Sequence, residues 1–486
     1  MSADLASIAG VDAPTGLLVG GEWSSGRRGV LPVLDPATEQ PIAEVADASA
    51  EDALEAVGAA YDALPGWAAR PPRERANCLH RAFELMIERA EPLARLMVLE
   101  NGKALPDARG EITYAAEFFR WYAEEAVRNE GYLAVAPSGA NKIMVQHQPV
   151  GVSVLITPWN FPAAMATRKI GPALAAGCTV VLKPAKETPL TALAIAAILG
   201  EAGVPAGVVN VLPTSKPGPL TEAMLADPRV RKLSFTGSTE VGRMLLTTAA
   251  QTVTNTSMEL GGNAPFLVFE DADIDAAVAG AYLAKMRNGG EACTAANRFY
   301  VHEAVAAEFS GKLARRLSAV RVGPGLEDGT ELGPLVNADT RDKVASLVAT
   351  AAADGSKVVL GGDAPARRGY FYNPTVLDEV PADAGILSEE IFGPVAPIVR
   401  FSDASQAIAL ANATEYGLVS YLYSGDLRRA LQVAEALEAG MVGINRGVVS
   451  DPAAPFGGVK QSGLGREGGH DGLLEFTETK YIAVDW

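Results

Sequence analysis

The sequence is poor in the residues that build several kinds of functional site. Its 486 residues include only three cysteines and four histidines. No Cys/His pair has the spacing of a zinc site, and no metal is expected. An odd, sparse cysteine count also argues against a disulfide framework and favours a reducing compartment, so we expect a cytoplasmic protein.

Positive charge is scarce as well, since 41 Lys+Arg stand against 58 Asp+Glu and the formal net charge is −17. Such a chain has no electrostatic reason to coat nucleic acid or an anionic membrane. Apolar stretches end well short of the roughly 20 residues of a membrane span, and the first segment, MSADLASIAGVDAPTG, lacks the pattern of a signal peptide. The composition is that of a globular chain of roughly two to four domains.

From about residue 150, short β-branched runs alternate with longer Ala-rich runs. Strands are predicted at 152–157, 178–183, 208–212 and 232–235, and helices at 162–176, at 189–203 and from about 239. A second alternation begins near residue 265. This order predicts an α/β fold with two parallel, doubly wound sheets, whose ligands bind at the carboxyl ends of the strands.

Two segments fall outside this alternation. Residues 127–149 and the C-terminal run TKYIAVDW (479–486) are predicted to be extended, and 127–149 with 470–486 are expected to form one β element. Strands that stand apart from the main sheets are candidates for pairing with another subunit. The expected organisation is therefore one α/β domain over 1–126 and 150–258, a second over 259–460, and a small β element that predicts a homodimer or homotetramer.

Six motifs stand at intervals along the chain. They are TPWNFP (157–162), FTGSTEVG (235–242), MELGGNAP (258–265), NGGEACTAANR (288–298), EEIFGPV (389–395) and PFGGVKQSGLGREG (455–468). In this order they resemble the aldehyde dehydrogenase superfamily over nearly the whole chain, and within it the bacterial succinate-semialdehyde dehydrogenases. The resemblance implies that the first domain binds a dinucleotide, the second is catalytic and the β element mediates oligomerisation.

Cys293 is the candidate nucleophile. It follows two glycines in a predicted loop, where a thiol can face a cleft and be activated as thiolate, whereas Cys78 and Cys178 are predicted to be core residues. In the resembling family this cysteine attacks the aldehyde carbon. The resemblance implies that the side-chain amide of Asn160 and the backbone N–H of Cys293 stabilise the oxyanion.

Two glutamates are assigned to proton transfer. Glu259 looks like the general base that activates water against the thioester, which favours hydrolysis to a free acid, and partial burial would raise its pKa. Glu467 is a candidate proton relay. A third carboxylate, Glu291, stands where the family often has glutamine, and we expect it to raise the pKa of the thiol of Cys293.

The cofactor site is expected at the strand ends, where a helix start favours phosphate. Lys186 stands where NAD-preferring relatives often carry glutamate, and because an ammonium can pair with a 2′-phosphate, NADP is expected to be accepted, with NAD as the alternative. The G-x-G-x-x-G pattern at 463–468 does not follow a strand and is predicted to be a turn. The expected cofactor residues are Thr157, Pro158, Trp159, Lys183, Lys186, Gly237, Ser238, Gly242, Glu390 and Phe392.

The substrate is the least constrained feature. Arg168, Arg287 and Ser450 look like the carboxylate-binding residues of succinate-semialdehyde dehydrogenases, so the expected substrate is succinic semialdehyde. Ala295 excludes the redox disulfide of some relatives. Glutarate semialdehyde or another aliphatic aldehyde, a thiol esterase without redox chemistry and a non-catalytic protein remain alternatives, although no G-x-S-x-G elbow occurs.

Overall fold

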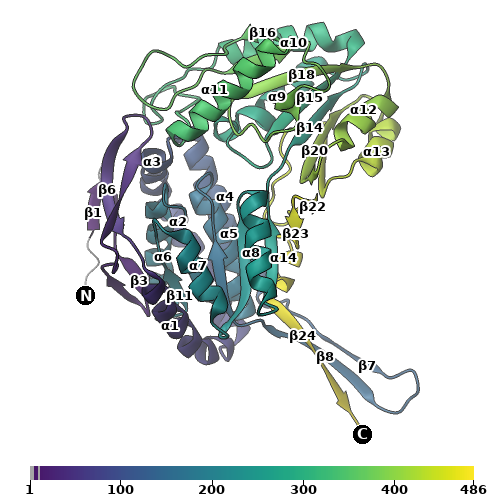
Figure 1. Cartoon of the computed structure of the whole chain (residues 1–486). Coiled ribbons are helices and arrows are strands. Elements are labelled where there is room, and N and C mark those ends of the chain that lie inside the picture. Colours follow the sequence, from purple (N-terminus) through teal and green to yellow (C-terminus); the bar gives the residue numbers. More distant parts are fainter. Residues whose placement is uncertain (1–4, 9–10, 486) are drawn as a thin grey trace.

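The computed structural model of the chain describes residues 5–8 and 11–485. Within this part, two large sheets each carry helices on both faces, and a thin three-stranded arm projects from the first unit (Figure 1). No helix among the described residues is both long and apolar enough to cross a membrane.

The first sheet has eight described strands in the order β23-β13-β12-β9-β10-β11-β3-β4. The five strands from β13 to β11 are parallel, and the edge strands pair antiparallel to them. The chain runs from β9 to β10 and β11 on one side and returns to β12 on the other, so the strand order reverses between β9 and β12, where a ligand crevice is expected. The strands are β3 (Leu17–Val19), β4 (Glu22–Ser24), β9 (Val152–Ile156), β10 (Thr179–Lys183), β11 (Val209–Val211), β12 (Val230–Thr236), β13 (Asn255–Glu259) and β23 (Gly463–Leu464).

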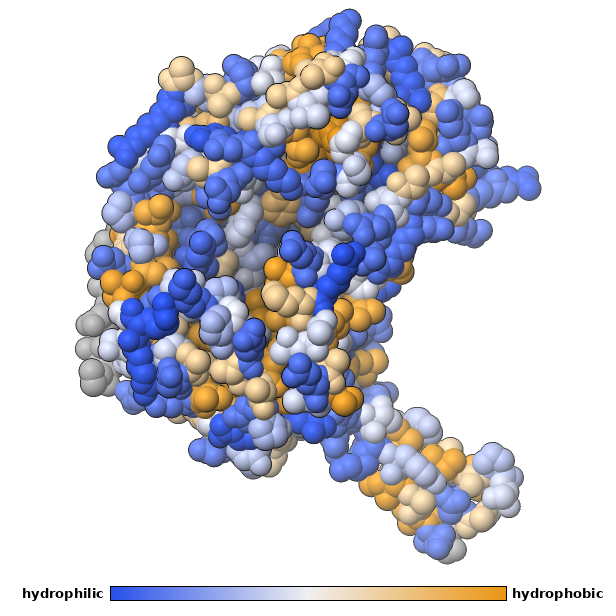
Figure 2. Space-filling view, in the orientation of Figure 1, coloured by the Kyte–Doolittle hydropathy of each residue, from blue (hydrophilic) through white to orange (hydrophobic). Residues whose placement is uncertain are grey.

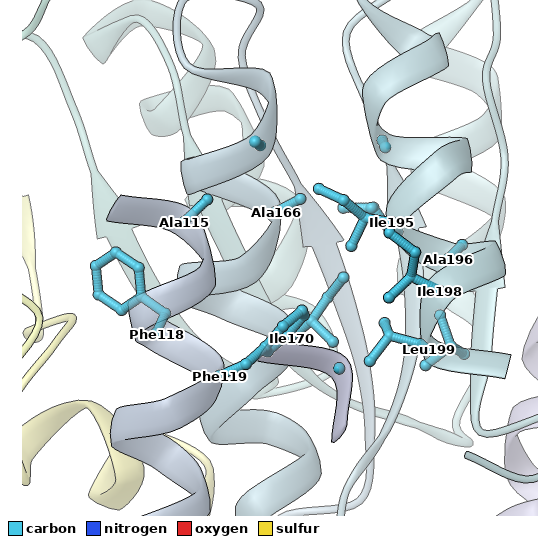
Figure 3. Close-up of a cluster of buried hydrophobic side chains, with 14 of the residues drawn as sticks. Ala115, Phe118, Phe119, Ala166, Ile170, Ile195, Ala196, Ile198 and Leu199 are labelled. Atoms are coloured by element: carbon cyan, nitrogen blue, oxygen red, sulfur yellow. The ribbon is translucent and has the colours of Figure 1, made fainter. Parts of the chain in front are cut away.

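Alternating side chains of the buried strands feed two separate cores. In β9, Val152, Val154 and Ile156 pack with α1, α7 and α8, whereas Leu155 packs with α2 to α6 on the other face. Figure 3 shows side chains of α4, α5 and α6 gathered in this second core. The helices are α1 (Ala50–Ala68), α2 (Pro72–Glu88), α3 (Ala90–Asn101), α4 (Leu105–Glu125), α5 (Pro162–Ala176), α6 (Pro189–Glu201), α7 (Pro217–Ala226) and α8 (Thr239–Ala250).

The second sheet has seven described strands in the order β16-β17-β18-β15-β14-β20-β21, all parallel except β16. Helices α9 and α10 cover one face and α11, α12 and α13 the other. The strands are β14 (Ala264–Val268), β15 (Ala296–His302), β16 (Lys357–Leu360), β17 (Thr375–Asp378), β18 (Val395–Phe401), β20 (Val419–Tyr423) and β21 (Met441–Ile444). The helices are α9 (Ile274–Met286), α10 (Glu303–Ser318), α11 (Ala338–Ala353), α12 (Ala404–Asn412) and α13 (Leu427–Ala436).

The arm joins distant parts of the chain. It is an antiparallel sheet of β7 (Tyr132–Val135), β8 (Lys142–Pro149) and β24 (Thr477–Val484), with β8 in the middle. Apolar side chains lie on its surface, Tyr132 and Leu133 being more than 60% exposed (Figure 2). Smaller elements are β1 (Leu5–Ile8), β2 (Val11–Pro14), β5 (Val30–Asp35), β6 (Gln40–Ala46), β19 (Tyr416–Gly417), β22 (Val459–Lys460), α14 (Asp471–Leu474) and the 3-10 turns η1 (Arg287–Gly290) and η2 (Gly385–Leu387).

The predicted α/β fold with two doubly wound sheets is confirmed, and the predicted strands and helices lie where expected to within a few residues. The helix predicted at 189–203 ends at Glu201 because Gly203 takes a left-handed conformation with φ +91°. Helix α7 was not predicted, since its first turn, Pro-Gly-Pro, looks like a loop. Cys78 and Cys178 lie in the first core, as expected.

Candidate active site

The carboxyl ends of β9 and β12 form the edge at which the first motifs meet. Residues 157–159 follow β9, and Gly237 follows β12. Ser238 is the N-cap of α8, and its hydroxyl accepts a hydrogen bond from the backbone N–H of Val241 at 3.4 Å. The remaining free N–H groups and the dipole of α8 favour an anion here, which is the environment expected for a pyrophosphate.

Two glycines of this motif have a packing role that the sequence did not reveal. A Cβ on Gly242 would lie 2.4 Å from Cδ2 of Leu260, and a Cβ on Gly237 would lie 2.5 Å from the ring of Phe235. A side chain at either position would force the Leu260 side chain or the Phe235 ring to move. The two glycines therefore allow these side chains to pack closely at the start of α8.

The end of β10 carries the expected lysine. Burial lowers the pKa of Lys183 to about 8, and the carboxylate of Glu187 acts in the opposite direction. Lys186 is exposed, and its Nζ lies 3.8 Å from Oε1 of Glu187. Lys186, Glu187 and Ser215 line one cavity of about 400 Å³. An ammonium group, a carboxylate and a hydroxyl thus share the space expected to hold the adenosine ribose.

Two further residues expected to hold the cofactor, Glu390 and Phe392, lie in the loop before β18 of the second sheet. Oε1 of Glu390 accepts a hydrogen bond from the backbone N–H of Gly262 at 3.1 Å, and burial raises the pKa of Glu390 to about 7. The ring of Phe392 stands edge-on to that of Trp159, with centroids 5.4 Å apart. Residues attached to both sheets therefore lie at the edge of the first sheet where the cofactor is expected.

Cys293 lies in the loop between η1 and β15 and is half-buried. Burial raises the pKa of its thiol to about 12. The cations Arg168 and Arg287 act to lower this pKa, and the carboxylates Glu390 and Glu259 act to raise it. The thiol therefore needs a proton acceptor close by to become a nucleophile near neutral pH.

The expectation that Glu291 raises the thiol pKa finds no support in the contacts of its side chain. Its Oε1 accepts a hydrogen bond from the backbone N–H of Val336 at 3.0 Å, and the carboxylates that raise the pKa of Cys293 are Glu390 and Glu259. Burial raises the pKa of Glu291 itself to about 8. At neutral pH its carboxyl group is largely protonated and resembles the glutamine that it replaces.

Asn160 lies in the bend between β9 and α5 and is 5% exposed. Its Nδ2 donates a hydrogen bond to the carbonyl oxygen of Glu291 at 3.1 Å, and its Oδ1 accepts one from the backbone N–H of Phe161 at 3.1 Å. Because the amide group is planar, the hydrogen bond that fixes one N–H of Nδ2 also fixes the direction of the second N–H on the same nitrogen. The Cys293 loop and the Asn160 amide are thus tied together, as an oxyanion site requires.

Glu259 ends β13 and is 3% exposed. Neither carboxylate oxygen has a hydrogen-bond partner among the described residues. Burial raises its pKa well above the ordinary value, the nearby Glu467 raises it further, and Lys169 acts in the opposite direction. A Cβ on Gly457 would lie 2.9 Å from Oε1, so only glycine leaves this space open. A buried carboxylate with a raised pKa and no internal hydrogen-bond partner among the described residues fits the expected general base.

Glu467, the expected proton relay, lies between two buried cations. Its Oε1 is 2.5 Å from Nζ of Lys169, and its Oε2 is 3.5 Å from Nη1 of Arg168. Lys169 also donates a hydrogen bond to Oγ of Ser234 at 2.9 Å. Glu467, which raises the pKa of Glu259, therefore belongs to a connected polar network with Arg168, Lys169 and Ser234.

A cavity of about 360 Å³ borders η1 and is lined by Arg287, Ser450, Tyr114 and Phe161, among others. The guanidinium of Arg287 lies 5.0 Å from the ring centroid of Phe161 and 5.8 Å from that of Tyr114. Arg287 forms no direct ion pair within the described part of the chain, although Asp107, Glu111 and Glu331 line the same cavity. Burial raises the pKa of Asp107, and the charges of Lys103 and Arg287 act in the opposite direction. A cation held against aromatic faces without a direct ion pair can take an anionic ligand.

Arg168 has a different environment from the other two expected substrate residues. It is 2% exposed, donates from Nη2 to the hydroxyl of Tyr114 at 2.6 Å, and stacks 4.2 Å from the ring centroid of Phe456. It does not line the cavity of Arg287 and Ser450. Its internal partner is Glu467, and its role in substrate binding stays a prediction.

Sequence reasoning missed the groups that hold Asn160 in place. Nζ of Lys103 donates to the carbonyl oxygen of Asn160 at 2.8 Å and forms an ion pair with Glu111, which accepts the backbone N–H of Ala163 at 2.9 Å. Lys103 lies 57 positions from Asn160. No local pattern marks it, because lysine and glutamate at these positions are equally typical of a solvated helix.

Three comparisons with known proteins agree with this geometry. A sequence profile of the aldehyde dehydrogenase family matches residues 23–482. Succinate-semialdehyde dehydrogenase of Paenarthrobacter nicotinovorans is 57% identical over 444 residues, which are 91% of this chain and 98% of that protein. Glutarate-semialdehyde dehydrogenase of Pseudomonas aeruginosa is 49% identical over 467 residues, 96% of each. A crystal structure described as an E. coli NADP dependent enzyme superposes with a TM-score of 0.96 at 48% identity and 98% coverage of both chains.

The chain belongs to the aldehyde dehydrogenase family and is an NAD(P)-dependent oxidoreductase of that family. The site fits a dinucleotide on its own contacts. The start of α8 lies at the edge expected for the pyrophosphate, and buried Lys183 and half-buried Glu390 supply groups that can form hydrogen bonds with ribose hydroxyls.

Proposed function

We propose that the protein oxidises an aldehyde bearing a distal carboxylate, most specifically succinic semialdehyde, to the dicarboxylic acid. The observation that carries this proposal is the placement of Arg287, without a direct ion pair among the described residues, in one cavity with Ser450; the cavity borders η1, the turn that precedes the Cys293 loop. A guanidinium and a hydroxyl can hold the far carboxylate while the aldehyde end faces the thiol. The names of the relatives support the same substrate class.

The first chemical step is attack of the sulfur of Cys293 on the aldehyde carbon. Glu259, whose carboxylate acts on the thiol electrostatically, is the group expected to take up the thiol proton. The negative charge that develops on the former carbonyl oxygen is stabilised by the free N–H of Asn160 and the backbone N–H of Cys293. Arg168 and Arg287 favour the thiolate through their positive charge.

Trp159, Phe392 and Glu390 would hold the nicotinamide end of the cofactor, which would supply a hydride acceptor for the carbon attached to sulfur. Before the thioester is hydrolysed, Glu259 must lose the proton that it took from the thiol, and Glu467 with Lys169 would pass this proton towards solvent. Glu259 then takes a proton from water, the resulting hydroxide attacks the thioester and releases the acid, and the departing thiolate of Cys293 recovers a proton from Glu259.

NADP is the favoured cofactor, with NAD as the alternative. Lys186 presents an exposed ammonium at the cavity expected to hold the adenosine ribose, and its pairing distance to Glu187, 3.8 Å, is long enough for exchange with a phosphate. The E. coli enzyme of similar structure is described as NADP dependent.

Glutarate semialdehyde is the second candidate substrate, because one relative of 49% identity carries that name. The two aldehydes differ by one methylene, which a pocket discriminates by only about 1–3 kcal/mol. Both would place the distal carboxylate at Arg287. We therefore propose a substrate with an ω-carboxylate, and among such aldehydes we expect succinic semialdehyde to be the preferred one.

The proposal also includes assembly and location. The arm exposes Tyr132, Leu133 and Val135, with Tyr481 on β24, and an isolated three-stranded sheet with such a surface is best stabilised by a second copy, so we expect a homodimer or homotetramer. Three free cysteines and an acidic surface favour the cytoplasm.

A substrate panel tests the proposal. Reduced cofactor is measured with succinic semialdehyde, glutarate semialdehyde, butanal and pentanal, each with NADP and with NAD. We expect kcat/KM to be highest for succinic semialdehyde and at least about tenfold lower for each neutral aldehyde. Equal values for the acidic and neutral aldehydes would contradict the carboxylate site. Acyl-ester hydrolysis without reduction of either cofactor by any aldehyde would favour the non-redox esterase instead.

A further inference from the structure

Asn288 connects the two halves of the oxyanion site through its side chain. Its Nδ2 donates to the carbonyl oxygen of Asn160 at 2.9 Å and to the carbonyl oxygen of Glu291 at 2.9 Å. Its own backbone N–H donates to Oδ2 of Asp107 at 3.0 Å. The residue is 2% exposed, so these bonds form away from competing water.

The backbone conformation of Asn288 places its side chain between those two carbonyls. It has φ 56° and ψ 35°, the left-handed region, which asparagine tolerates better than most residues. Gly289 and Gly290 follow with φ 64° and 80°. This run of positive φ values turns the chain sharply from α9 into the loop of Cys293.

The carbonyl oxygen of Glu291 completes the connection. It accepts one hydrogen bond from Nδ2 of Asn288 and another from Nδ2 of Asn160. Asn160 is therefore held at two points, by its backbone carbonyl and by its side-chain amide. The Glu291 carbonyl also lies two residues before Cys293, whose backbone N–H is the other proposed oxyanion donor.

We infer that Asn288 is a positioning residue for the oxyanion site, which holds the Asn160 amide and the Cys293 backbone N–H at the separation that the oxyanion requires. The inference rests on the proposed role of Asn160. Asn288 acts through these neighbours, since both of its side-chain hydrogen bonds end on backbone carbonyls. Asp107, which accepts the hydrogen bond from the backbone N–H of Asn288, also lines the substrate cavity. One hydrogen bond therefore connects the wall of that cavity to the oxyanion site.

Asn288→Gly is the variant that tests this role. Glycine retains the left-handed backbone and the N–H to Asp107, and removes only the two side-chain bonds. Because a misplacement of about 1 Å in an active site costs on the order of 100-fold, we expect kcat to fall about 10- to 100-fold. The KM for NADP should change by less than about threefold. Asn288 also lines the substrate cavity, so the KM for aldehyde is measured with both succinic semialdehyde and butanal to separate a change in that cavity's wall from the loss in kcat.

Asn210→Ala is the matched control. Asn210, in β11, is fully buried and also bridges two carbonyls, those of Val180 at 3.1 Å and Gly207 at 2.8 Å, but lies outside the site. Its loss should lower the melting temperature and leave kcat unchanged. All kcat values are expressed per Cys293 titrated by alkylation, so misfolded protein does not enter the comparison. Asn288→Gly with kcat within about twofold of the parent would overturn the inference.

A double-variant cycle separates this inference from the proposal on which it rests. If Asn288 acts through the oxyanion donors, the loss of kcat in Asn160→Ala/Asn288→Gly should be clearly smaller than the product of the two single losses, because the Asn160 amide is already gone and only the effect on the Cys293 N–H remains. Losses that multiply would mean that Asn288 acts elsewhere and would overturn its assignment. If instead Asn160→Ala itself retains kcat, the proposed oxyanion role of Asn160 is wrong. A low kcat for Asn160→Ala with a normal kcat for Asn288→Gly refutes only the positioning role.

Discussion

Replacing Arg287 with methionine should separate acidic from neutral substrates. The structure holds the Arg287 guanidinium against Phe161 and Tyr114 in the substrate cavity, with no direct ion pair among the described residues. Methionine keeps an apolar chain of similar length against the same rings and removes the charge and all donors. Arg287→Lys keeps the charge and removes the planar fork.

The size of the effect follows from the bond that is lost. A hydrogen bond to a charged group contributes about 1.5–3 kcal/mol, and about 1.36 kcal/mol corresponds to tenfold in rate. We therefore expect kcat/KM for succinic semialdehyde to fall roughly 10- to 160-fold in Arg287→Met. Butanal, which has the same number of carbons and no carboxylate, should change by less than about threefold, because its contacts are apolar. Arg287→Lys should lie between the parent and Arg287→Met.

The assay is initial-rate formation of reduced cofactor at saturating NADP, with both aldehydes measured on the same preparations. Most of the loss should appear in KM, since the distal carboxylate is bound equally in the ground state and the transition state. Ser450→Ala should produce a smaller loss of the same selectivity. Equal losses for succinic semialdehyde and butanal would refute the carboxylate site, and unchanged values for both would remove Arg287 from substrate binding altogether.

Three further predictions concern the base, the cofactor and the arm. Because Glu467 raises the pKa of Glu259, and the base acts only when ionised, Glu467→Gln should shift the acidic limb of the kcat–pH profile to lower pH; a shift to higher pH would contradict the coupling. Lys186→Glu should reduce kcat/KM for NADP at least about tenfold and spare NAD; an equal loss with both cofactors would exclude a 2′-phosphate contact. Leu133→Asp on the arm should shift the sedimentation coefficient towards the monomer; an unchanged value would exclude this surface as the interface.

Much of the fold could be predicted because its elements are local. Strand β9 and strand β10 are short, mostly apolar runs, and helix α5 between them begins at Pro162 and ends at Gly177. These signals depend only on neighbouring residues. Helix α7 was missed for the same reason, because its own first turn carries the residues of a loop.

The nucleophile, the base and the oxyanion amide could be assigned because they lie in short motifs that resemble a known family. The sequence could not say what surrounds them. The expected effect of Glu291 on the thiol finds no support, because its side chain turns to Val336, 45 positions away. The guanidinium groups of Arg168 and Arg287 lie 5.7 Å and 5.8 Å from the Tyr114 ring centroid. The sequence could not show that the guanidinium of Arg168 also pairs with Glu467, 299 positions away.

Short local patterns therefore determined the alternation of strands and helices along the chain. They also indicated the candidate reactive groups and the class of chemistry. Tertiary structure alone decided which charges act on those groups. The pKa values of Cys293 and Glu259 depend on burial and on carboxylates and cations brought together from both sheets, and the Asn160 amide depends on Asn288 and Lys103. The physical reason is that desolvation and Coulomb interactions act through space, over distances that sequence separation does not record.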